Sequence, residues 1–238
     1  MRQETGSSNT PQEKRISVKL SAGGDLFVID ELVAELAAMD VGASGASGAS
    51  EASGASEASE AKVRVELLTK RVMLMPAERL TNVEAQESES VSMEVVREEL
   101  LRGGISYYED EAVVTMRSGD RVALVVVPKA MLRLLDERCG VDGVAYEVPI
   151  LRRAVGEERH LIVDSVRGVT TILMYERGGE LAFADVYETP TDASAIYWVQ
   201  RVAKAVEMGE EIYLYIYRCS GTMRRLLQRD FKKMMICE

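Results

Sequence analysis

The stretch from His160 to Lys233 carries the clearest alternation of strand and helix patterns in this chain. Short apolar runs separated by turn signals predict strands, and longer segments with helical spacing predict helices. The predicted strands cover residues 161–163, 171–175, 181–187 and 212–217, and the predicted helices cover residues 192–208 and 222–235. The Gly178-Gly179 pair precedes the third strand, where a hairpin turn needs positive φ. The stretch therefore reads as one α/β unit.

Two of these elements have a clear internal pattern. In the helix predicted at 192–208, small or branched apolar residues recur at helical spacing and form one stripe. They are Ala195, Val199, Val202 and Val206. The strand at 212–217 alternates isoleucine or leucine with tyrosine, so both of its faces can pack, as in a central strand with helices on each side. Three strands followed by helix, strand and helix is the order of one ribonuclease-H-like half.

The chain begins with segments of very different character. Residues 1–14 have no apolar period and are interpreted as a flexible tail. Residues 16–20 and 26–29 predict a hairpin, and residues 32–38 are interpreted as a third strand, with one or two helical turns as the alternative. Residues 42–61 contain only Gly, Ala, Ser and Glu, which is typical of a flexible linker or loop.

Regular patterns resume after this low-complexity segment. Strands are predicted at 63–68, 72–75, 112–116, 121–127 and 144–148, and helices at 76–80, 91–101 and 128–140. In the helix at 91–101, we expect Val95 and Leu100 to point inward, and Gly103-Gly104 to end the helix. Ser118-Gly119-Asp120 predicts the turn of a hairpin.

Composition limits the class of protein. With 238 residues, 47% of them hydrophobic, the chain can bury one sizeable core or two modest ones. No run approaches the roughly 20 apolar residues of a membrane span, and the polar N-terminus lacks the apolar core of a signal peptide.

The three cysteines show no metal or disulfide spacing, which favours free thiols in a reducing cytoplasm. The single histidine, His160, is expected to be an ordinary surface residue. A net charge of −10 disfavours nucleic acid and anionic membranes as partners.

Several segments, each weak alone, resemble a known family in their order and spacing. They are residues 16–21, 72–80, 125–129, 179–181, 187, 191–199 and 215–221. Together they resemble a bacterial family of unknown function with an actin-like ATPase fold. This resemblance implies an α/β protein with a duplicated ribonuclease-H-like fold, in which two lobes, 15–152 and 160–238, each have a mixed sheet and flanking helices. The chain departs from that pattern at 42–61, where such a fold would carry its first crossover helix.

The resemblance also implies where a nucleotide would bind. Active members of the actin, Hsp70 and sugar-kinase superfamily hold phosphates with two hairpins, which need an acidic residue for Mg²⁺ or water and glycines with exposed N–H groups. The first hairpin here has glycines but no carboxylate at the end of its strand, and the second has an aspartate but places Ser165 and Val166 where glycine is wanted. One reading is Mg-ATP bound by Ser21, Gly23, Gly24, Asp164, Gly168, Thr170 and Gly221. The other is a fold that has lost its nucleotide, with ordinary hairpin turns and Asp164 as a turn-capping residue.

The predicted closing helix carries a basic stripe. Arg225, Arg229 and Lys232 are spaced by four and seven residues on an otherwise acidic chain. This stripe could bind an acidic protein partner, RNA phosphate or the chain's own acidic segment at 84–99. Our first hypothesis is a non-catalytic interaction or regulatory module that binds a protein partner or itself, with no catalytic residue, no metal ligand and no cofactor. The alternatives are an ATP-binding enzyme or regulator that uses Asp164 and Mg²⁺, and, more weakly, an RNA-binding protein.

Overall fold

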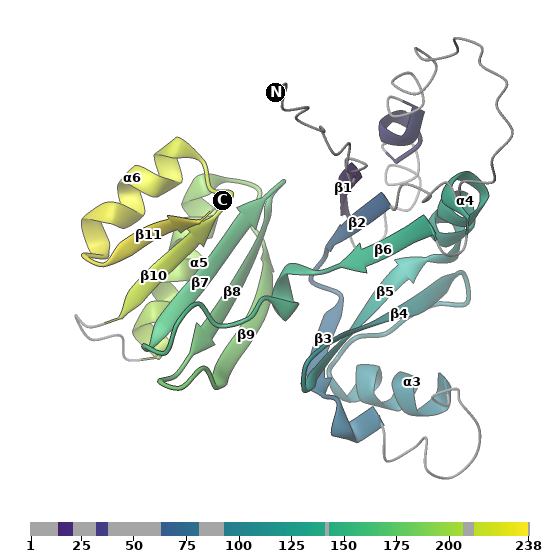
Figure 1. The fold of residues 1–238 in the computed structure, drawn as a ribbon, viewed down its shortest axis with the longest axis horizontal. Coiled ribbons are helices and arrows are strands. Elements are labelled where there is room, and N and C mark those ends of the chain that lie inside the picture. Colours follow the sequence, from purple (N-terminus) through teal and green to yellow (C-terminus); the bar gives the residue numbers. More distant parts are fainter. Residues whose placement is uncertain are drawn as a thin grey trace, which may run out of the picture.

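In the computed structural model (Figure 1), the described residues are 14–20, 32–37, 63–80, 93–140, 143–206 and 212–237. They form an N-terminal half, up to Leu151, and a C-terminal half that starts at His160. The connector at 152–159 joins the two halves. The predictions for the tail up to residue 13, for the turn and strand at 21–29 and for the linker at 42–61 lie outside the described residues.

The C-terminal half contains the strands and helices that the sequence predicts, together with one additional strand. Its elements are β7 (His160–Val166), β8 (Val169–Tyr175), β9 (Leu181–Glu188), α5 (Asp192–Ala205), β10 (Tyr213–Tyr217), α6 (Gly221–Asp230) and β11 (Met234–Cys237). Strands β7, β8 and β9 form an antiparallel meander, β10 pairs parallel with β7, and β11 pairs parallel with β10. The sheet order is therefore β11-β10-β7-β8-β9.

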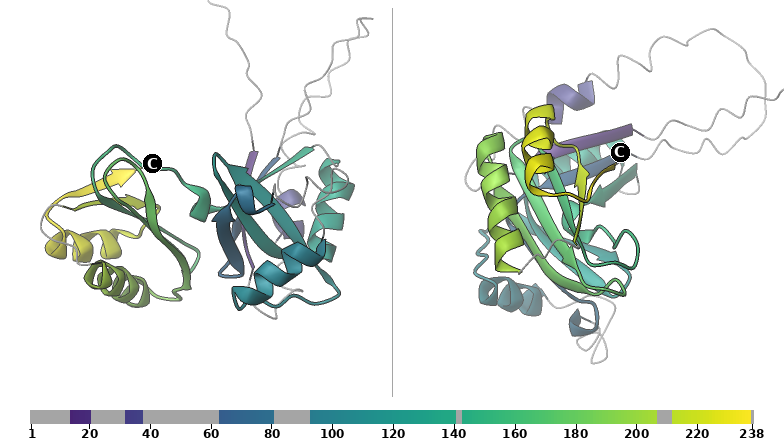
Figure 2. Two further views of the ribbon diagram at one scale, coloured as in Figure 1. Left: turned by 90° about the horizontal axis from the view of Figure 1, so that it is seen from below. Right: turned by 90° about the vertical axis from the view of Figure 1, so that its left-hand side faces the viewer.

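Both helices of this half cover the same face of the sheet (Figure 2). On that face, Val163 of β7 and Ile216 of β10 pack with Val199 of α5 and Leu227 of α6. The opposite face carries the tyrosines of β10, and Tyr215 packs into a core shared with the N-terminal half. The expectation of helices on each side of β10 is thus wrong, because its second face packs against the other half of the molecule.

The closing helix is shorter than the pattern at 222–235 predicts. Helix α6 ends at Asp230, Phe231 has an extended backbone (φ −118°, ψ 109°), and residues 234–237 form β11. Met234 lies opposite Leu214 of β10 in the parallel ladder. Residues 231–235 keep a helical spacing of apolar side chains, but pairing with the buried strand β10 makes 234–237 extended. Lys232 therefore lies beyond the helix.

The N-terminal half contains two small sheets. Its elements are β1 (Lys14–Lys19), a helix at 32–37, β2 (Val63–Leu68), β3 (Val72–Pro76), α3 (Met93–Arg102), β4 (Glu111–Ser118), β5 (Arg121–Pro128), α4 (Lys129–Cys139), β6 (Val144–Glu147) and the 3-10 turn η2 (Pro149–Leu151). Strands β1, β2 and β6 pair in parallel in the order β1-β2-β6. Strands β3, β5 and β4 form the second sheet, which is antiparallel and packs against α3.

Two predictions in this half need correction. Residues 32–37 are helical rather than extended, and the buried Leu32 and Leu36 lie four residues apart, on one face of a helix. In α3, the inward residues are Val96 and Leu100, which have the same spacing, whereas Val95 is half-buried. The segment is helical and Leu100 points inward, both as predicted, but Val96 rather than Val95 is buried beside it.

His160 is buried, which contradicts its interpretation as a surface histidine. Its ring stacks on Tyr175 with centroids 5.2 Å apart, Nε2 accepts a hydrogen bond from the Val155 N–H at 3.1 Å, and Nδ1 lies 2.5 Å from the Glu158 carbonyl oxygen. The histidine therefore fixes the connector onto the first strand of the C-terminal half. No helix among the described residues is long and apolar enough to cross a membrane.

Candidate functional site

The candidate site lies where the ends of β7 and β10 approach β1 and β2 of the other half. Asp164, near the end of β7, is buried, and its side chain is only 1% exposed. Arg152 of the connector donates to Asp164 Oδ2 from Nε at 2.9 Å and from Nη2 at 2.6 Å. Arg218, directly after β10, donates from Nε to Oδ1 at 2.9 Å and from Nη2 to Oδ2 at 2.6 Å. Two guanidinium groups thus enclose one carboxylate.

Arg218 also connects the two halves of the molecule. Its Nη1 donates to Glu66 of β2, a buried carboxylate that accepts a further bond of 2.9 Å from the Ser17 hydroxyl of β1. Its backbone has φ +46°, a conformation that non-glycine residues adopt rarely. Burial alone would lower the pKa of Arg218, but its hydrogen bonds to Asp164 and Glu66 outweigh burial and raise it. Arg218 is therefore positively charged throughout the physiological pH range.

The β7–β8 hairpin touches the N-terminal half at its turn. Arg167 and Gly168 both have positive φ, of 50° and 75°. Arg167 donates from Nη1 to the Ser17 carbonyl at 2.7 Å and from Nη2 to Glu35 at 2.5 Å. A Cβ placed on Gly168 would lie 3.2 Å from Lys19 Nζ. The hairpin that the sequence suggested for phosphate binding is thus fastened to β1 by its own side chains.

The structure places the other predicted nucleotide-site residues as follows. Thr170 is buried, and its hydroxyl bonds to Thr189 Oγ1 at 2.7 Å and to Ser165 Oγ at 3.0 Å. Gly221 is the first residue of α6, and the preceding Ser220 caps that helix by accepting from the Met223 N–H. Ser21, Gly23 and Gly24 lie outside the described residues. Asp164, Gly168 and Thr170 therefore share one hairpin, with Asp164 inside a strand rather than at a turn.

The residues that complete this site were not among those predicted from the sequence. Arg152, Arg218 and Glu66 come from three segments, and Glu66 and Arg218 are 152 positions apart. Nothing in the local sequence distinguishes them from surface charges. The one usable signal is that Arg218 directly follows a strand with an apolar core pattern, where a charged side chain lies close to the protein interior.

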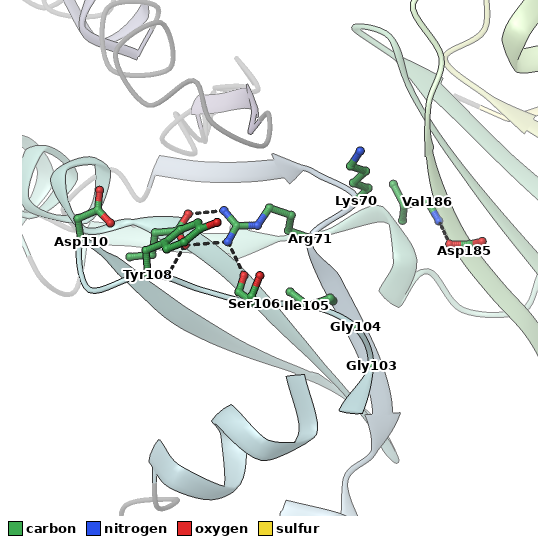
Figure 3. Close-up of a pocket in the computed structure, with 11 residues that line it drawn as sticks. Lys70, Arg71, Gly103, Gly104, Ile105, Ser106, Tyr108, Asp110, Asp185 and Val186 are labelled. Carbon is green, nitrogen blue, oxygen red and sulfur yellow. Dashed lines mark hydrogen bonds and ion pairs between the residues drawn. The ribbon is translucent and has the colours of Figure 1, made fainter. Parts of the chain in front are cut away.

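A cavity of about 610 Å³, lined by none of these site residues, lies between β9 and the N-terminal half (Figure 3). Its residues are Lys70, Arg71, Gly103, Gly104, Ile105, Ser106, Tyr108, Asp110, Glu111, Asp185 and Val186. Arg71 forms a bidentate ion pair with Glu111 and also donates to the Ser106 carbonyl at 2.7 Å. Lys70 pairs with Glu188 of β9 at 3.1 Å. Several of the charged groups around this cavity are therefore already paired with neighbours.

The ionisation of Glu111 follows from these contacts. Burial would raise the pKa of this carboxyl, but the hydrogen bond from Arg71, the N–H of Tyr108 and the charge of Arg71 outweigh burial and hold the pKa below its usual value. Glu111 is therefore an ionised structural group at neutral pH.

The predicted basic stripe is only partly formed. Arg225 and Arg229 lie on the exposed side of α6, while Lys232 follows the end of the helix. Of the acidic segment at 84–99, the described residues 93–99 belong to α3, which lies at the other end of the molecule from α6 (Figure 1). Those residues are thus too far away to neutralise the arginines within one chain.

Solved structures with a similar fold are known. A Bacteroides thetaiotaomicron protein with an actin-like ATPase fold and unknown function aligns with a TM-score of 0.59 and 15% identity, over 94% of this chain and 91% of that chain. This chain has an actin-like ATPase fold. No family model matches the sequence, and no curated protein does.

Two further structures align less well. The cytoplasmic domain of EpsL, an inner membrane component of the type II secretion system of Vibrio cholerae, gives a TM-score of 0.34 with 16% identity, over 73% of this chain and 75% of that chain. The PilM–PilN type IV pilus biogenesis complex gives 0.44 with 13% identity, over 74% of this chain and 69% of that chain.

An actin-like ATPase fold implies Mg-ATP between its halves, so the described residues can be tested for their fit to that ligand. Both oxygens of Asp164 accept hydrogen bonds from guanidinium groups, and positive charge lies where a cation or its bound water would have to approach. The Thr170 hydroxyl is engaged with two neighbouring hydroxyls. These residues do not fit a Mg²⁺-bound phosphate. No group of three or more His, Cys, Asp or Glu side chains that could hold a metal ion occurs in the part of the chain that the structure describes.

Proposed function

We propose that this protein is a non-catalytic interaction module, in which an actin-like ATPase fold is held together by its own arginines instead of by a nucleotide. We further propose that its halves are degenerate copies of one ribonuclease-H-like unit, corresponding to lobes 15–152 and 160–238. The strand orders β6-β2-β1 and β11-β10-β7, both fully parallel, support this duplication.

One observation carries the proposal. Asp164 is the acidic residue available on the second hairpin, and Arg152 and Arg218 occupy it from two sides. An ATPase needs such a carboxylate to be free for Mg²⁺ or a water molecule. A carboxylate paired with two arginines can instead fix geometry, because bidentate guanidinium contacts are directional.

The same contacts suggest how the module works. Arg218 reaches Asp164 in one half and Glu66 in the other, and Arg167 reaches the Ser17 carbonyl and Glu35. In a nucleotide-dependent protein, the ligand would bridge the halves and its hydrolysis would release them. Here protein side chains make the bridge permanently, so the module presents one fixed surface to a protein partner or to a second copy. The half-buried thiols of Cys139, Cys219 and Cys237 fit a reducing compartment such as the cytoplasm.

Thermal unfolding with Mg-ATP tests this proposal. We expect the melting temperature of the full chain to be the same with millimolar Mg-ATP, with ATP and EDTA, and with neither, because a ligand stabilises a protein only by binding its folded state. The variant Glu137→Ala, altered on the exposed side of α4, serves as a control for the reproducibility of the melts. A rise of several degrees with Mg-ATP that disappears in EDTA would instead favour the alternative of an ATP-binding enzyme or regulator.

A further inference from the structure

The C-terminal half has an open sheet edge beside a basic helix. Strand β11 is the last strand of its sheet and pairs only with β10 among the described strands. Helix α6 lies next to it (Figures 1 and 2). An edge strand presents backbone N–H and C=O groups that can pair with another polypeptide, and proteins usually cover or blunt such edges.

The side chains of this edge are unusually apolar. Met235 and Ile236 are 45% and 47% exposed, and because successive side chains of a strand point to opposite faces, one lies on each side of the sheet. Leu226 of α6 is a third exposed large apolar residue in this region, at 39%. The edge can therefore offer an added strand both ladder hydrogen bonds and apolar contacts.

Basic side chains lie beside the edge, and three of them have no anionic partner among the described residues. Arg224, Arg225 and Arg229 of α6 are exposed and make no ion pair or side-chain hydrogen bond with the described residues. Lys232 and Lys233 follow, just before β11. Positive and negative residues balance over 151–238, so the net charge of −10 lies entirely in residues 1–150. The basic residues of α6 and of 232–233 therefore lie in the half of the chain with no net negative charge, where anions are not repelled.

These observations distinguish between classes of anionic partner. Phosphates of a nucleic acid would use the arginines but neither the ladder groups nor the apolar side chains of β11. An extended acidic peptide uses all three, because its backbone pairs with the edge, its apolar side chains contact Met235 and Ile236, and its carboxylates reach α6. We propose that the α6–β11 surface, comprising α6, Lys232, Lys233 and β11, binds an acidic, extended segment of a protein partner by strand addition. This rests on the proposed function only in that the chain acts through protein contacts.

Fluorescence anisotropy with synthetic probes tests the proposal on the full chain. The probe is a labelled decapeptide of alternating glutamate and valine. We expect it to bind, and we expect Arg225→Glu/Arg229→Glu to weaken binding by roughly tenfold or more, as loss of two charge-assisted contacts implies. Arg133→Glu/Arg138→Glu on α4 changes the net charge equally at a distance from β11 and should leave binding within about twofold.

Two further probes separate strand addition from simple charge attraction. A peptide of alternating glutamate and proline keeps the charge but loses half of the backbone donors, and it should bind roughly tenfold or more weakly. A single-stranded RNA decamer of similar charge should not displace the glutamate–valine peptide. Absence of glutamate–valine binding at about 1 mM, equal binding of the proline peptide, displacement by RNA, or insensitivity to the α6 variant would each overturn the proposal. None of these results depends on Mg-ATP, so failure here leaves the thermal test of the proposed function independent.

Discussion

At the scale of single residues, the role of Asp164 separates a nucleotide-binding protein from one in which arginines have replaced the nucleotide. Its replacement by alanine leaves Arg152 and Arg218 facing each other, with side chains only 25% and 27% exposed. Removing one partner from a buried ion pair costs about 3–5 kcal/mol, and we expect Asp164→Ala to fall near the lower end because the arginines keep some solvent contact. Urea unfolding measures this loss against Glu137→Ala on the exposed side of α4, which should change stability by no more than about 0.5 kcal/mol. Unchanged stability would mark Asp164 as a spare carboxylate that is available to a ligand.

Glu111 gives a prediction with a pH dependence. Its pKa is lowered in the folded protein, so the stability that its charge contributes is complete above the ordinary value of 4.5 and is lost as pH falls through the folded pKa. We expect Glu111→Gln to be less stable than the natural protein by about 1–3 kcal/mol at pH 7, because Arg71 loses its charged partner. When unfolding in urea is measured between pH 7 and pH 3, the difference in unfolding free energy between the two proteins should narrow only below about pH 4.5. A gap that is constant over this range would show that the carboxylate charge does not contribute.

Arg218 shows why the site itself could not be read from the sequence. The strand before it was predictable, since alternation of apolar residues with tyrosine fixes β10. The role of the arginine depends on Glu66, which is brought near only when the two halves pack. His160 is a similar case, because its burial depends on the connector and on Tyr175. Local patterns predict elements, whereas contacts between distant segments decide what a charged side chain does.

At the scale of elements, the turn of the β7–β8 hairpin has a backbone geometry that favours glycine at position 168. Gly168 has φ +75°, and a side chain there would approach Lys19 Nζ and the Thr189 carbonyl. We expect Gly168→Ala to cost about 1–3 kcal/mol, the usual strain of a non-glycine residue in this backbone region plus crowding. Gly221→Ala is the matched control, because a Cβ at the first residue of α6 meets nothing within 4 Å. Differential unfolding in urea compares the two, and equal losses would argue against a turn-specific constraint.

Elements stabilised by local sequence signals were predicted well, whereas elements stabilised by pairing with neighbouring segments were not. Helix α5 has a full apolar stripe and a Thr191–Ser194 capping box, so its start at Asp192 follows from local signals. Strand β11 has four residues and exists because β10 offers an open ladder beside it. The short helix at 32–37 was ambiguous in sequence, since Leu32 and Leu36 alone do not separate helix from strand. Short segments take the structure that their neighbours impose.

At the scale of the whole molecule, the two halves share a core. One cluster of buried residues includes Ile16 and Val65 of the N-terminal half and Leu173 and Val186 of the C-terminal half. The buried Ile150 of η2 belongs to the same cluster. Polar contacts reinforce it, because Arg121 of β5 donates to the Tyr175 hydroxyl of β8 at 2.8 Å. Halves joined by both apolar and ionic contacts are expected to unfold together rather than as independent domains.

The single tryptophan allows this cooperativity to be measured. Trp198 lies in α5 and packs with the cluster confined to the C-terminal half, so its fluorescence follows that half alone, whereas far-ultraviolet circular dichroism follows both. We expect the two signals to give the same urea midpoint for the natural protein, because neither half keeps its core when the other unfolds. Ile150→Ala should lower stability by about 2–5 kcal/mol and, by thinning the contact between the halves, should also separate the two midpoints. Leu161→Ala, within the C-terminal cluster, should lower both midpoints together. Separate midpoints in the natural protein would mean that the halves are independent domains, and that a ligand or partner is needed to hold them in the arrangement described.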